Sequence, residues 1–429
     1  GDGKADKESV FMDDLNCPTG FQFYKDGILL MQAPDLWWIR DTNNDGKADR
    51  YRTLWDDFGM TGNYHEFAFG PARGPDGALY VALNLASAGA GVFKEIGGTW
   101  SEIGQASRQQ LMSGQTKTAG RMYSRVPYRG CIMRIADGGR GAAELYATGF
   151  RSPNGIGFDG QGHLLVNDNQ GDWRGSSPLQ VVTKGSFNGH PASLVWSPGW
   201  DKGDPLALPV PELEKLRTQP GGIFIQSELS NSPTQPAVFP KSWGALAGQV
   251  VFGEMNAARL VRFVGEDIGG VHQGAMIPFL DTKTLRNGNH RMAFAPDGAL
   301  HVGKTHLSWA GNNGIVRIEA PKSLPPLIET VRLTATGFEV RFTEAIAKTS
   351  LVPALRSFRY KYHVAYGSPK VDELDLTSAW SLSADGKTLS LPLPEIRAGF
   401  IHEIKLAGAK TPDGRDLLGP IAYYQVVKK

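Results

Sequence analysis

One short pattern recurs along the first three quarters of the chain: an apolar segment, a tight turn rich in Asp and Gly, and a second apolar segment. An Asp-Gly turn between alternating apolar runs is the strongest short-range signal of a β-hairpin. Further apolar segments follow most hairpins, and units of four strands around an axis make a β-propeller. The pattern occurs at 18–32, 65–84, 153–168 and 290–305, and less regularly at 244–263.

We therefore predict an all-β fold that begins with a six-bladed β-propeller over residues 1–322, with five or seven blades as the alternatives. One blade is expected in the irregular, Pro-rich residues 188–243. The pattern changes after a linker at 320–327. Short alternating strands then fill about one hundred residues, which suits a small immunoglobulin-like β-sandwich over 323–429. The formal charge of +2 gives no sign of a nucleic-acid surface, and no apolar run is long enough for a membrane span.

An acidic turn occurs twice, about forty residues apart, which is a blade-like spacing. The complete copy reads Asp-Thr-Asn-Asn-Asp-Gly-Lys-Ala-Asp and alternates side-chain oxygens around a glycine turn. Calcium prefers such an oxygen shell. We expect a structural calcium ion on the propeller face opposite the functional one, although an Asx-rich turn without metal is the alternative. The first copy starts in mid-motif, so we expect the natural chain to begin earlier. The predicted calcium residues are Asp41, Asn43, Asp45, Lys47 and Asp49.

Propeller geometry predicts where the functional side chains gather. The start of the first strand and the end of the second strand of each hairpin lie at one mouth of the central channel, where pockets form. Solvated loop ends are the alternative for any single residue. The polar residues at these positions are Gln32, His65, Asn84, Arg151, Asn154, Asp168, Asn169, Glu254, Arg291 and Lys304.

Several of these residues have chemistry suited to an active site. An imidazole such as His65 can take a proton from an alcohol, or it can be structural. Arg151, Arg291 and Lys304 can hold carboxylates or an oxyanion, or pair with Glu254 and Asp168. Aromatic rings after the second strands stack on sugars or planar cofactors, or else cap the core. These rings are Trp173 and Trp309, and the weaker rim candidates are His190 and His306.

The chain resembles the secreted sorbosone/glucose dehydrogenase-like propellers, which include membrane-bound dehydrogenase and haem-binding proteins of planctomycete-type bacteria. The resemblance rests on segments along nearly the whole chain, the last of which lies in the predicted sandwich. Members often carry a Cys-x-x-Cys-His haem motif, which this sequence does not contain. The segments are 41–49, 151–173, 187–191, 293–305, 314–319 and 360–372.

The resemblance extends to soluble quinoprotein sugar dehydrogenases, six-bladed propellers that bind pyrroloquinoline quinone on the axis with calcium. It implies that His65 and Arg151 are catalytic, with His65 as the base, although residues 71–73 lengthen the interval to the hairpin. Arg151 and Asn154 resemble a cofactor-binding Arg-Asn pair, here interrupted at 152–153. By their position at the channel mouth, and not by the resemblance, we add cofactor ligands and substrate residues. The added cofactor ligands are Arg291, Lys304 and Trp173, and the added substrate residues are Glu254, Asp168, Asn169 and His190.

The first hypothesis is thus a periplasmic or secreted oxidoreductase acting on a sugar or polyol, with an electron-transfer protein as possible partner. A second is a metal-dependent lyase or hydrolase acting on an acidic glycan, with ligands from His65, His190, Glu254 and Asp168. A third is a calcium-stabilised propeller that binds glycans or proteins without catalysis. Cys17 and the distant Cys131 either pair across blades or remain free thiols.

Overall fold

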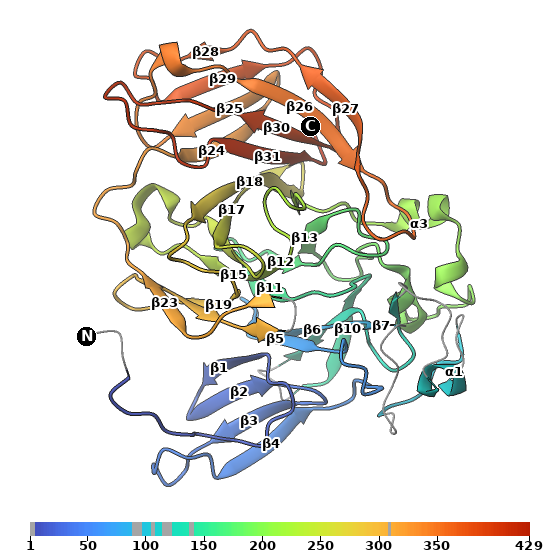
Figure 1. Cartoon of the computed structure of the whole chain (residues 1–429). Coiled ribbons are helices and arrows are strands. Elements are labelled where there is room, and N and C mark those ends of the chain that lie inside the picture. Colours follow the sequence, from blue (N-terminus) through green and yellow to red (C-terminus); the bar gives the residue numbers. More distant parts are fainter. Residues whose placement is uncertain (1–4, 88–96, 104–107, 114–121, 137–140, 308–309) are drawn as a thin grey trace. The chain divides into compact units, whose positions relative to one another are not determined.

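The computed structural model describes residues 5–87, 97–103, 108–113, 122–136, 141–307 and 310–429. These residues form antiparallel β-sheets with a few short helices, which confirms the predicted all-β class (Figure 1). Two compact units are present: residues 1–156 with 191–208, and residues 157–190 with 209–429.

The first unit contains two four-stranded antiparallel sheets built from the predicted hairpins (Figure 1). The first sheet has strand order β1-β2-β3-β4 and the second has order β10-β9-β6-β5. Their strands are β1 (Gly20–Tyr24), β2 (Gly27–Met31), β3 (Leu36–Arg40), β4 (Arg50–Trp55), β5 (Ala68–Arg73), β6 (Leu79–Leu83), β9 (Cys131–Ile135) and β10 (Ala143–Thr148). Short elements complete the unit: β7 (Ala86–Ser87), β8 (Met122–Tyr123), α1 (Arg108–Met112), η1 (Pro191–Trp196) and η2 (Pro205–Ala207).

The β5–β6 hairpin shows how the sequence forms these sheets. Gly77 adopts φ 77° in the turn, a conformation that favours glycine. The Asp76 side chain accepts the Ala78 amide at 3.1 Å and so closes the turn. Every residue of β6 is buried, because this strand lies inside its sheet.

The second unit continues the blade-like pattern. Strands β11 (Gly155–Phe158, which begins in the first unit), β12 (Leu164–Asn167), β13 (Ser177–Val182) and β14 (Gly222–Phe224) form one sheet in chain order. Strands β15 (Pro233–Val238), β16 (Val250–Glu254), β17 (Arg259–Ile268) and β18 (Val271–Asp281) form the next. A three-stranded sheet follows, with β19 (Asn289–Phe294), β20 (Leu300–Lys304) and β23 (Ile315–Ile318), beside the small pair β21 (His306–Leu307) and β22 (Ala310–Gly311).

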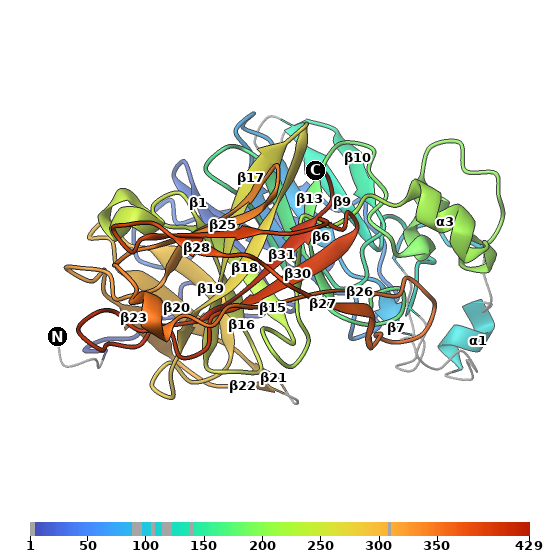
Figure 2. The ribbon, with the colours of Figure 1, turned by 90° about the horizontal axis from the view of Figure 1, so that it is seen from above.

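The C-terminal residues form a two-sheet β-sandwich with one shared apolar core. One sheet has order β24-β25-β29-β28, and the other has order β31-β30-β26-β27 and continues the β15–β18 sheet through β18. Figure 2 shows the long β17–β18 pair beside β31 and β30. The strands are β24 (Ile328–Thr334), β25 (Gly337–Phe342), β26 (Ala354–Tyr360), β27 (Lys370–Leu376), β28 (Ser381–Leu382), β29 (Thr388–Pro392), β30 (Phe400–Lys405) and β31 (Ile421–Val426).

The Pro-rich residues 188–243 form no sheet of their own. They supply β14 and β15 to neighbouring sheets and contain η1, η2, α3 (Val210–Leu216) and the start of η3 (Lys241–Leu246); η4 (Lys348–Ser350) lies in the sandwich. The blade predicted within 188–243 is therefore wrong as placed, because its two strands belong to two different sheets. The described residues contain five blade-like sheets, and a total of six blades and the immunoglobulin type of the sandwich stay predictions. Among the described residues, none of the helices has the length and apolar character needed to cross a membrane.

Candidate functional site

Three predicted site segments meet in the first unit: the residue before β5, the end of β6 and the approach to β11. The Nδ1 of His65 lies 3.1 Å from the main-chain oxygen of Leu85. The Leu85 amide in turn donates to the Arg151 carbonyl at 3.0 Å. Asn84 Nδ2 donates to Ser152 Oγ at 3.1 Å. These contacts link the segments of His65, Asn84 and Arg151 into one hydrogen-bonded network.

The contact with Leu85 fixes the protonation pattern of the His65 ring. A carbonyl oxygen can only accept a hydrogen bond, so Nδ1 carries the proton in this contact. In a neutral imidazole the other nitrogen, Nε2, then holds the lone pair. This tautomer is the one that a general base requires.

A buried arginine that the sequence analysis did not select supports the segment before β5. Arg129 is fully buried and donates from Nε to the Gly59 carbonyl at 2.7 Å. Its Nη1 donates to the carbonyls of Glu66 and Phe67 at 2.8 and 3.0 Å. These two residues directly follow His65, so Arg129 fixes the backbone that carries the imidazole.

Arg151 and Asn154, the predicted cofactor-binding pair, are both buried in the first unit. Asn84 Oδ1 is buried and has no hydrogen-bond partner among the described residues. An amide oxygen in this state suits a donor such as a hydroxyl group, because a buried acceptor without a partner costs free energy. The set thus combines an imidazole, a guanidinium and amides.

Polar residues at the ends of β12 and β16 form a second network, in the second unit. Asp168 is buried and accepts hydrogen bonds of 3.0 Å from Arg174 Nε and Nη2. Asn169 Nδ2 donates to Ser232 Oγ at 3.2 Å, and its Oδ1 is buried without a partner among the described residues. The Ser232 amide donates to Glu254 Oε2 at 3.0 Å. Three of the four predicted substrate residues therefore lie in one network.

Glu254 is held from several sides by its own chain. Oε2 also accepts from the Asn231 amide at 3.0 Å and from the Ser230 hydroxyl, and Oε1 accepts from the Asn256 amide at 2.8 Å. A carboxylate that accepts this many bonds from nearby amides orders the loop that carries them. This geometry gives Glu254 a clear role in shaping the loop at 230–232.

The same network continues to Lys304 at the end of β20. Asn289 Nδ2 donates to the Glu254 carbonyl at 3.0 Å, and the Lys304 ammonium donates to Asn289 Oδ1 and, at 2.6 Å, to the Leu285 carbonyl. Burial and the Arg286 charge lower the pKa of Lys304 to about 8. Lys304 therefore supports the local fold as well as carrying a charge. Arg291, another predicted cofactor ligand, donates from Nη1 to the His290 carbonyl at 3.1 Å.

Trp173 and His190 lie beneath the loop between β26 and β27 of the sandwich. The Trp173 amide donates to the His363 carbonyl at 3.1 Å, and its ring centroid lies 5.3 Å from that of Tyr362. The Tyr362 hydroxyl donates to the Gly189 carbonyl at 2.5 Å. His190 Nε2 lies 3.1 Å from Asp172 Oδ2, and both side chains are buried. Trp309, the other predicted stacking residue, lies outside the described residues.

A cavity of about 680 Å³ adjoins Trp173 in the second unit, with walls from β13, α3, β26 and the loop after β26. Trp173 Nε1, Gln180 Oε1 and Arg217 Nε belong to its lining residues and are buried without a hydrogen-bond partner among the described residues. The Arg217 guanidinium lies 4.4 Å from the Tyr362 ring centroid. The cavity therefore combines aromatic surface with polar atoms that remain to be satisfied.

The predicted calcium loop joins β3 to β4 and has the expected turn. Gly46 adopts φ 86°, and its amide donates to Asp41 Oδ2 at 2.8 Å. The Asp45 amide donates to Asn43 Oδ1 at 3.0 Å. Asp49 accepts from the amide and hydroxyl of Thr42, which lowers the pKa of its carboxyl group.

The donor set of this loop fits calcium, since its carboxylate and amide oxygens come from alternating positions around a glycine turn. Lys47 contributes its amide to Asp45 Oδ1 at 2.8 Å. Calcium binding by Asp41, Asn43, Asp45, Lys47 and Asp49 stays a prediction.

The two cysteines are free thiols, Cys17 exposed and Cys131 buried, and burial raises the pKa of Cys131.

Residues 1–185 match the model of a protein family described as a domain of unknown function (DUF7133). No curated protein matches the chain. Among solved structures, a putative glucose dehydrogenase from Thermus thermophilus is 17% identical, with a TM-score of 0.39 over 71% of this chain and 97% of the other. The PQQ-bound aldose sugar dehydrogenase from Streptomyces coelicolor is 16% identical, with a TM-score of 0.34 over 72% and 96%.

The holo pyranose dehydrogenase PQQ domain from Coprinopsis cinerea is 12% identical, with a TM-score of 0.41 over 69% of this chain and 81% of the other. Similarities at this level assign neither a family nor an activity. Membership of the sorbosone/glucose dehydrogenase-like group stays a prediction from the sequence segments.

Proposed function

We propose that this protein is an oxidoreductase that oxidises a hydroxyl group of a sugar or polyol to a carbonyl, with the proton leaving the hydroxyl oxygen, the hydride leaving the carbon that bears it, and His65 acting as the base. The observation that carries the proposal is the 3.1 Å contact between His65 Nδ1 and the Leu85 carbonyl, which leaves the lone pair on Nε2. The hydroxyl proton passes to Nε2, and Arg151 stabilises the negative charge that develops on the substrate oxygen.

The chemistry of the first unit fits a carboxylated quinone as the hydride acceptor. Arg151 offers a guanidinium for a carboxylate and Asn154 an amide. Asn84 Oδ1, which has no hydrogen-bond partner among the described residues, suits a substrate hydroxyl. A pyrroloquinoline quinone bound there would supply the two-electron acceptor for the hydride. The same proposal includes Arg291 and Lys304 as further ligands of the quinone. It also includes an extracytoplasmic location and an electron-transfer protein as partner.

The test is reconstitution of the full chain with pyrroloquinoline quinone and calcium, followed by sugar oxidation measured with an artificial electron acceptor. His65→Gln is expected to lower turnover about 10²–10⁴-fold while quinone binding, followed by absorbance, is retained. His301→Gln changes a histidine of β20 outside this network and serves as the matched control. Absence of quinone binding to the wild-type chain would exclude the quinone, and full activity of His65→Gln would exclude the base.

A second candidate function is glycan binding without catalysis, and the cavity beside Trp173 favours it. Sugars bind through stacking of their C–H faces on aromatic rings together with hydrogen bonds to their hydroxyl groups. The cavity is lined by Tyr362 and Trp173, and by Gln180 and Arg217, whose Oε1 and Nε have no hydrogen-bond partner in the part of the chain that the structure describes. Titration calorimetry with neutral and acidic oligosaccharides tests this. Binding that is lost in Arg217→Met and kept in His65→Gln supports the second candidate and separates it from the first.

A further inference from the structure

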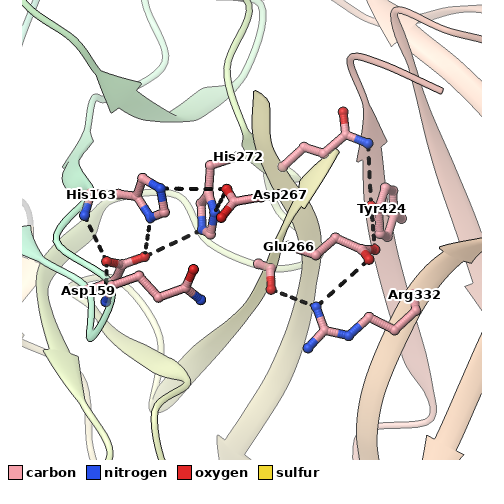
Figure 3. Close-up of polar contacts among 10 residues, drawn as sticks. Asp159, His163, Glu266, Asp267, His272, Arg332 and Tyr424 are labelled. Atoms are coloured by element: carbon pink, nitrogen blue, oxygen red, sulfur yellow. Dashed lines mark hydrogen bonds and ion pairs between the residues drawn. The ribbon is translucent and has the colours of Figure 1, made fainter. Parts of the chain in front are cut away.

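Two histidines and two aspartates from different sheets of the second unit meet at one point (Figure 3). Asp159 and His163 lie in the turn between β11 and β12. Asp267 and His272 face each other across the β17–β18 hairpin, where they are paired residues of the antiparallel register. None of the four belongs to the predicted functional residues.

The two imidazole rings are stacked, with centroids 4.0 Å apart and an interplanar angle of 26°. One nitrogen of each ring faces Asp159 Oδ2: His163 Nδ1 at 2.8 Å and His272 Nε2 at 3.5 Å. The other nitrogen of each ring faces Asp267 Oδ1: His272 Nδ1 at 2.9 Å and His163 Nε2 at 3.5 Å. The pair of rings therefore lies between two carboxylates.

Counting donors shows that this arrangement is incomplete by itself. A neutral imidazole has one N–H donor and one lone pair, and a carboxylate only accepts. Two neutral rings thus satisfy two of the four contacts and direct two lone pairs at carboxylate oxygens. Two protonated rings would satisfy all four, but they would place two positive charges in stacked rings 4.0 Å apart.

A divalent cation between the rings and Asp159 removes this conflict. Both Asp159-facing lone pairs and the carboxylate then bind the ion, and both remaining N–H groups donate to Asp267. A carboxylate that accepts the outer N–H of a metal-bound histidine is the usual second-shell partner, and it orients the ring. One ion therefore satisfies every nitrogen in the cluster.

We propose that His163 Nδ1, His272 Nε2 and Asp159 bind a divalent transition-metal ion of the zinc type, with Asp267 as the positioning residue. Two imidazoles with one carboxylate suit zinc, whereas calcium and magnesium prefer oxygen alone. The three ligand atoms lie within 4.8 Å of one another. Tetrahedral zinc needs donor pairs about 3.3 Å apart, so small side-chain movements close the site around an ion and one water.

The surrounding structure prepares the site. Asp159 Oδ1 accepts the amides of Gln161 and His163 at 2.9 and 2.8 Å, which fixes the carboxylate with Oδ2 toward the rings. The Asp159 and His272 side chains are 6% and 4% exposed, whereas that of His163 is 28% exposed and leaves a path for the ion.

The position gives the ion a structural role. Beside the site, Glu266 Oε1 accepts the Tyr424 hydroxyl and the Leu333 amide at 2.7 and 2.8 Å, and Arg332 donates to the Gly265 carbonyl at 2.7 Å (Figure 3). The β17–β18 hairpin is thus already joined to the sandwich. The ion adds a link from this hairpin to the β11–β12 turn, in a separate sheet.

The test uses the full chain, stripped with a chelator and kept in excess calcium so that the β3–β4 loop does not contribute. Calorimetry with Zn²⁺ is expected to give one equivalent bound, with a rise in the thermal midpoint. Co²⁺ is expected to give the visible absorption of a tetrahedral site. Asp267→Asn keeps the side-chain shape and is expected to weaken Zn²⁺ binding about 10- to 100-fold.

His163→Ala replaces a partly exposed side chain and is expected to abolish the Zn²⁺ equivalent while circular dichroism stays that of the wild type. His301→Ala, which removes a histidine elsewhere in the unit, is expected to bind as the wild type does. The proposal is overturned if the wild-type chain binds neither ion, or if His163→Ala and Asp267→Asn bind Zn²⁺ with wild-type affinity.

Discussion

Arg129 Nη1 donates a 2.8 Å hydrogen bond to the main-chain carbonyl of Glu66, the residue after His65. Both side chains are buried, and the Glu66 carboxylate accepts the Thr61 amide at 2.5 Å. Burial raises the pKa of Glu66, and the Arg129 charge opposes this shift. The main-chain hydrogen bonds of buried Arg129, together with its charge near the Glu66 carboxyl group, therefore fix the segment that carries the proposed base.

Arg129→Met is expected to lower the free energy of unfolding by about 3–5 kcal/mol, because it leaves Glu66 buried without a counter-charge. It also removes the donor of the Gly59 and Glu66 carbonyls, whereas the Phe67 carbonyl keeps the Asn84 amide at 2.9 Å. Urea unfolding followed by fluorescence measures the loss. Arg134→Met removes an ion pair with Asp76 at the surface and is the control, with an expected loss of about 0–1 kcal/mol. Equal losses for the two variants would contradict the role given to Arg129.

Calcium is expected to bind the β3–β4 loop and raise the thermal midpoint, and a chelator is expected to reverse this. Asp45→Ala is expected to abolish the binding seen by calorimetry, because it removes a charged oxygen ligand. Lys47→Ala is the control, since an ammonium group cannot bind a cation while its main-chain carbonyl remains available. Loss of binding in Lys47→Ala with retention in Asp45→Ala would refute this ligand assignment.

Local signals predicted the parts of the fold that depend on turns. The Asp-Gly turns at 76–77 and 297–298 lie between paired strands, as expected. Hairpin order also led us to expect His65, Asn84 and Arg151 at one edge. Hydrogen bonds link their segments, and a shared functional site stays a prediction. The Pro-rich residues 188–243 lack such turns, and their two strands belong to sheets that local sequence cannot indicate.

Contacts between distant segments were beyond the sequence pattern. Trp173 follows a second strand as expected, but the loop carrying Tyr362 packs against it, and nothing near either residue indicates that contact. The same holds for Asp159 and His272, which lie more than one hundred residues apart in separate sheets. Arg129 was missed because a lone arginine in a polar segment is usually a surface residue.

His402 is expected to make stability depend on pH. Its side chain is buried, and Nδ1 has no hydrogen-bond partner among the described residues. The pKa of His402 is lowered from 6.5 to about 4, mainly by burial and to a smaller extent by the Arg397 charge. A lowered histidine pKa means that, as the pH falls below 6.5, protons bind the unfolded chain before the folded one.

The His402 contribution is therefore fully present above pH 6.5 and is lost progressively as the pH falls toward 4. Between pH 7 and pH 5 the expected loss is roughly 2 kcal/mol. Urea unfolding at both values measures it, and His402→Leu is expected to remove this part of the pH dependence. An unchanged pH dependence in His402→Leu would assign the effect to other groups.

Glu254→Gln separates a structural role of this residue from the substrate role that the sequence suggested. The carboxylate accepts the amides of Asn231, Ser232 and Asn256. Glutamine has an NH2 group where one carboxylate oxygen stood, and this donor would face the N–H groups that the oxygen accepted. We therefore expect the free energy of unfolding to fall by about 2–4 kcal/mol. A substrate residue would instead leave urea unfolding unchanged and raise KM for the sugar.

The control for this change is Glu266→Gln. Glu266 accepts a hydrogen bond from the Tyr424 hydroxyl beside the proposed metal site. This variant measures the stability cost of altering a hydrogen-bonded carboxylate elsewhere in the unit. In the loop at 230–232, the amides of Asn231 and Ser232 donate to Glu254, and the Ser232 hydroxyl accepts a hydrogen bond from Asn169 Nδ2. Because of this link, Glu254→Gln is also expected to mobilise Asn169, whose side-chain oxygen is buried without a described partner.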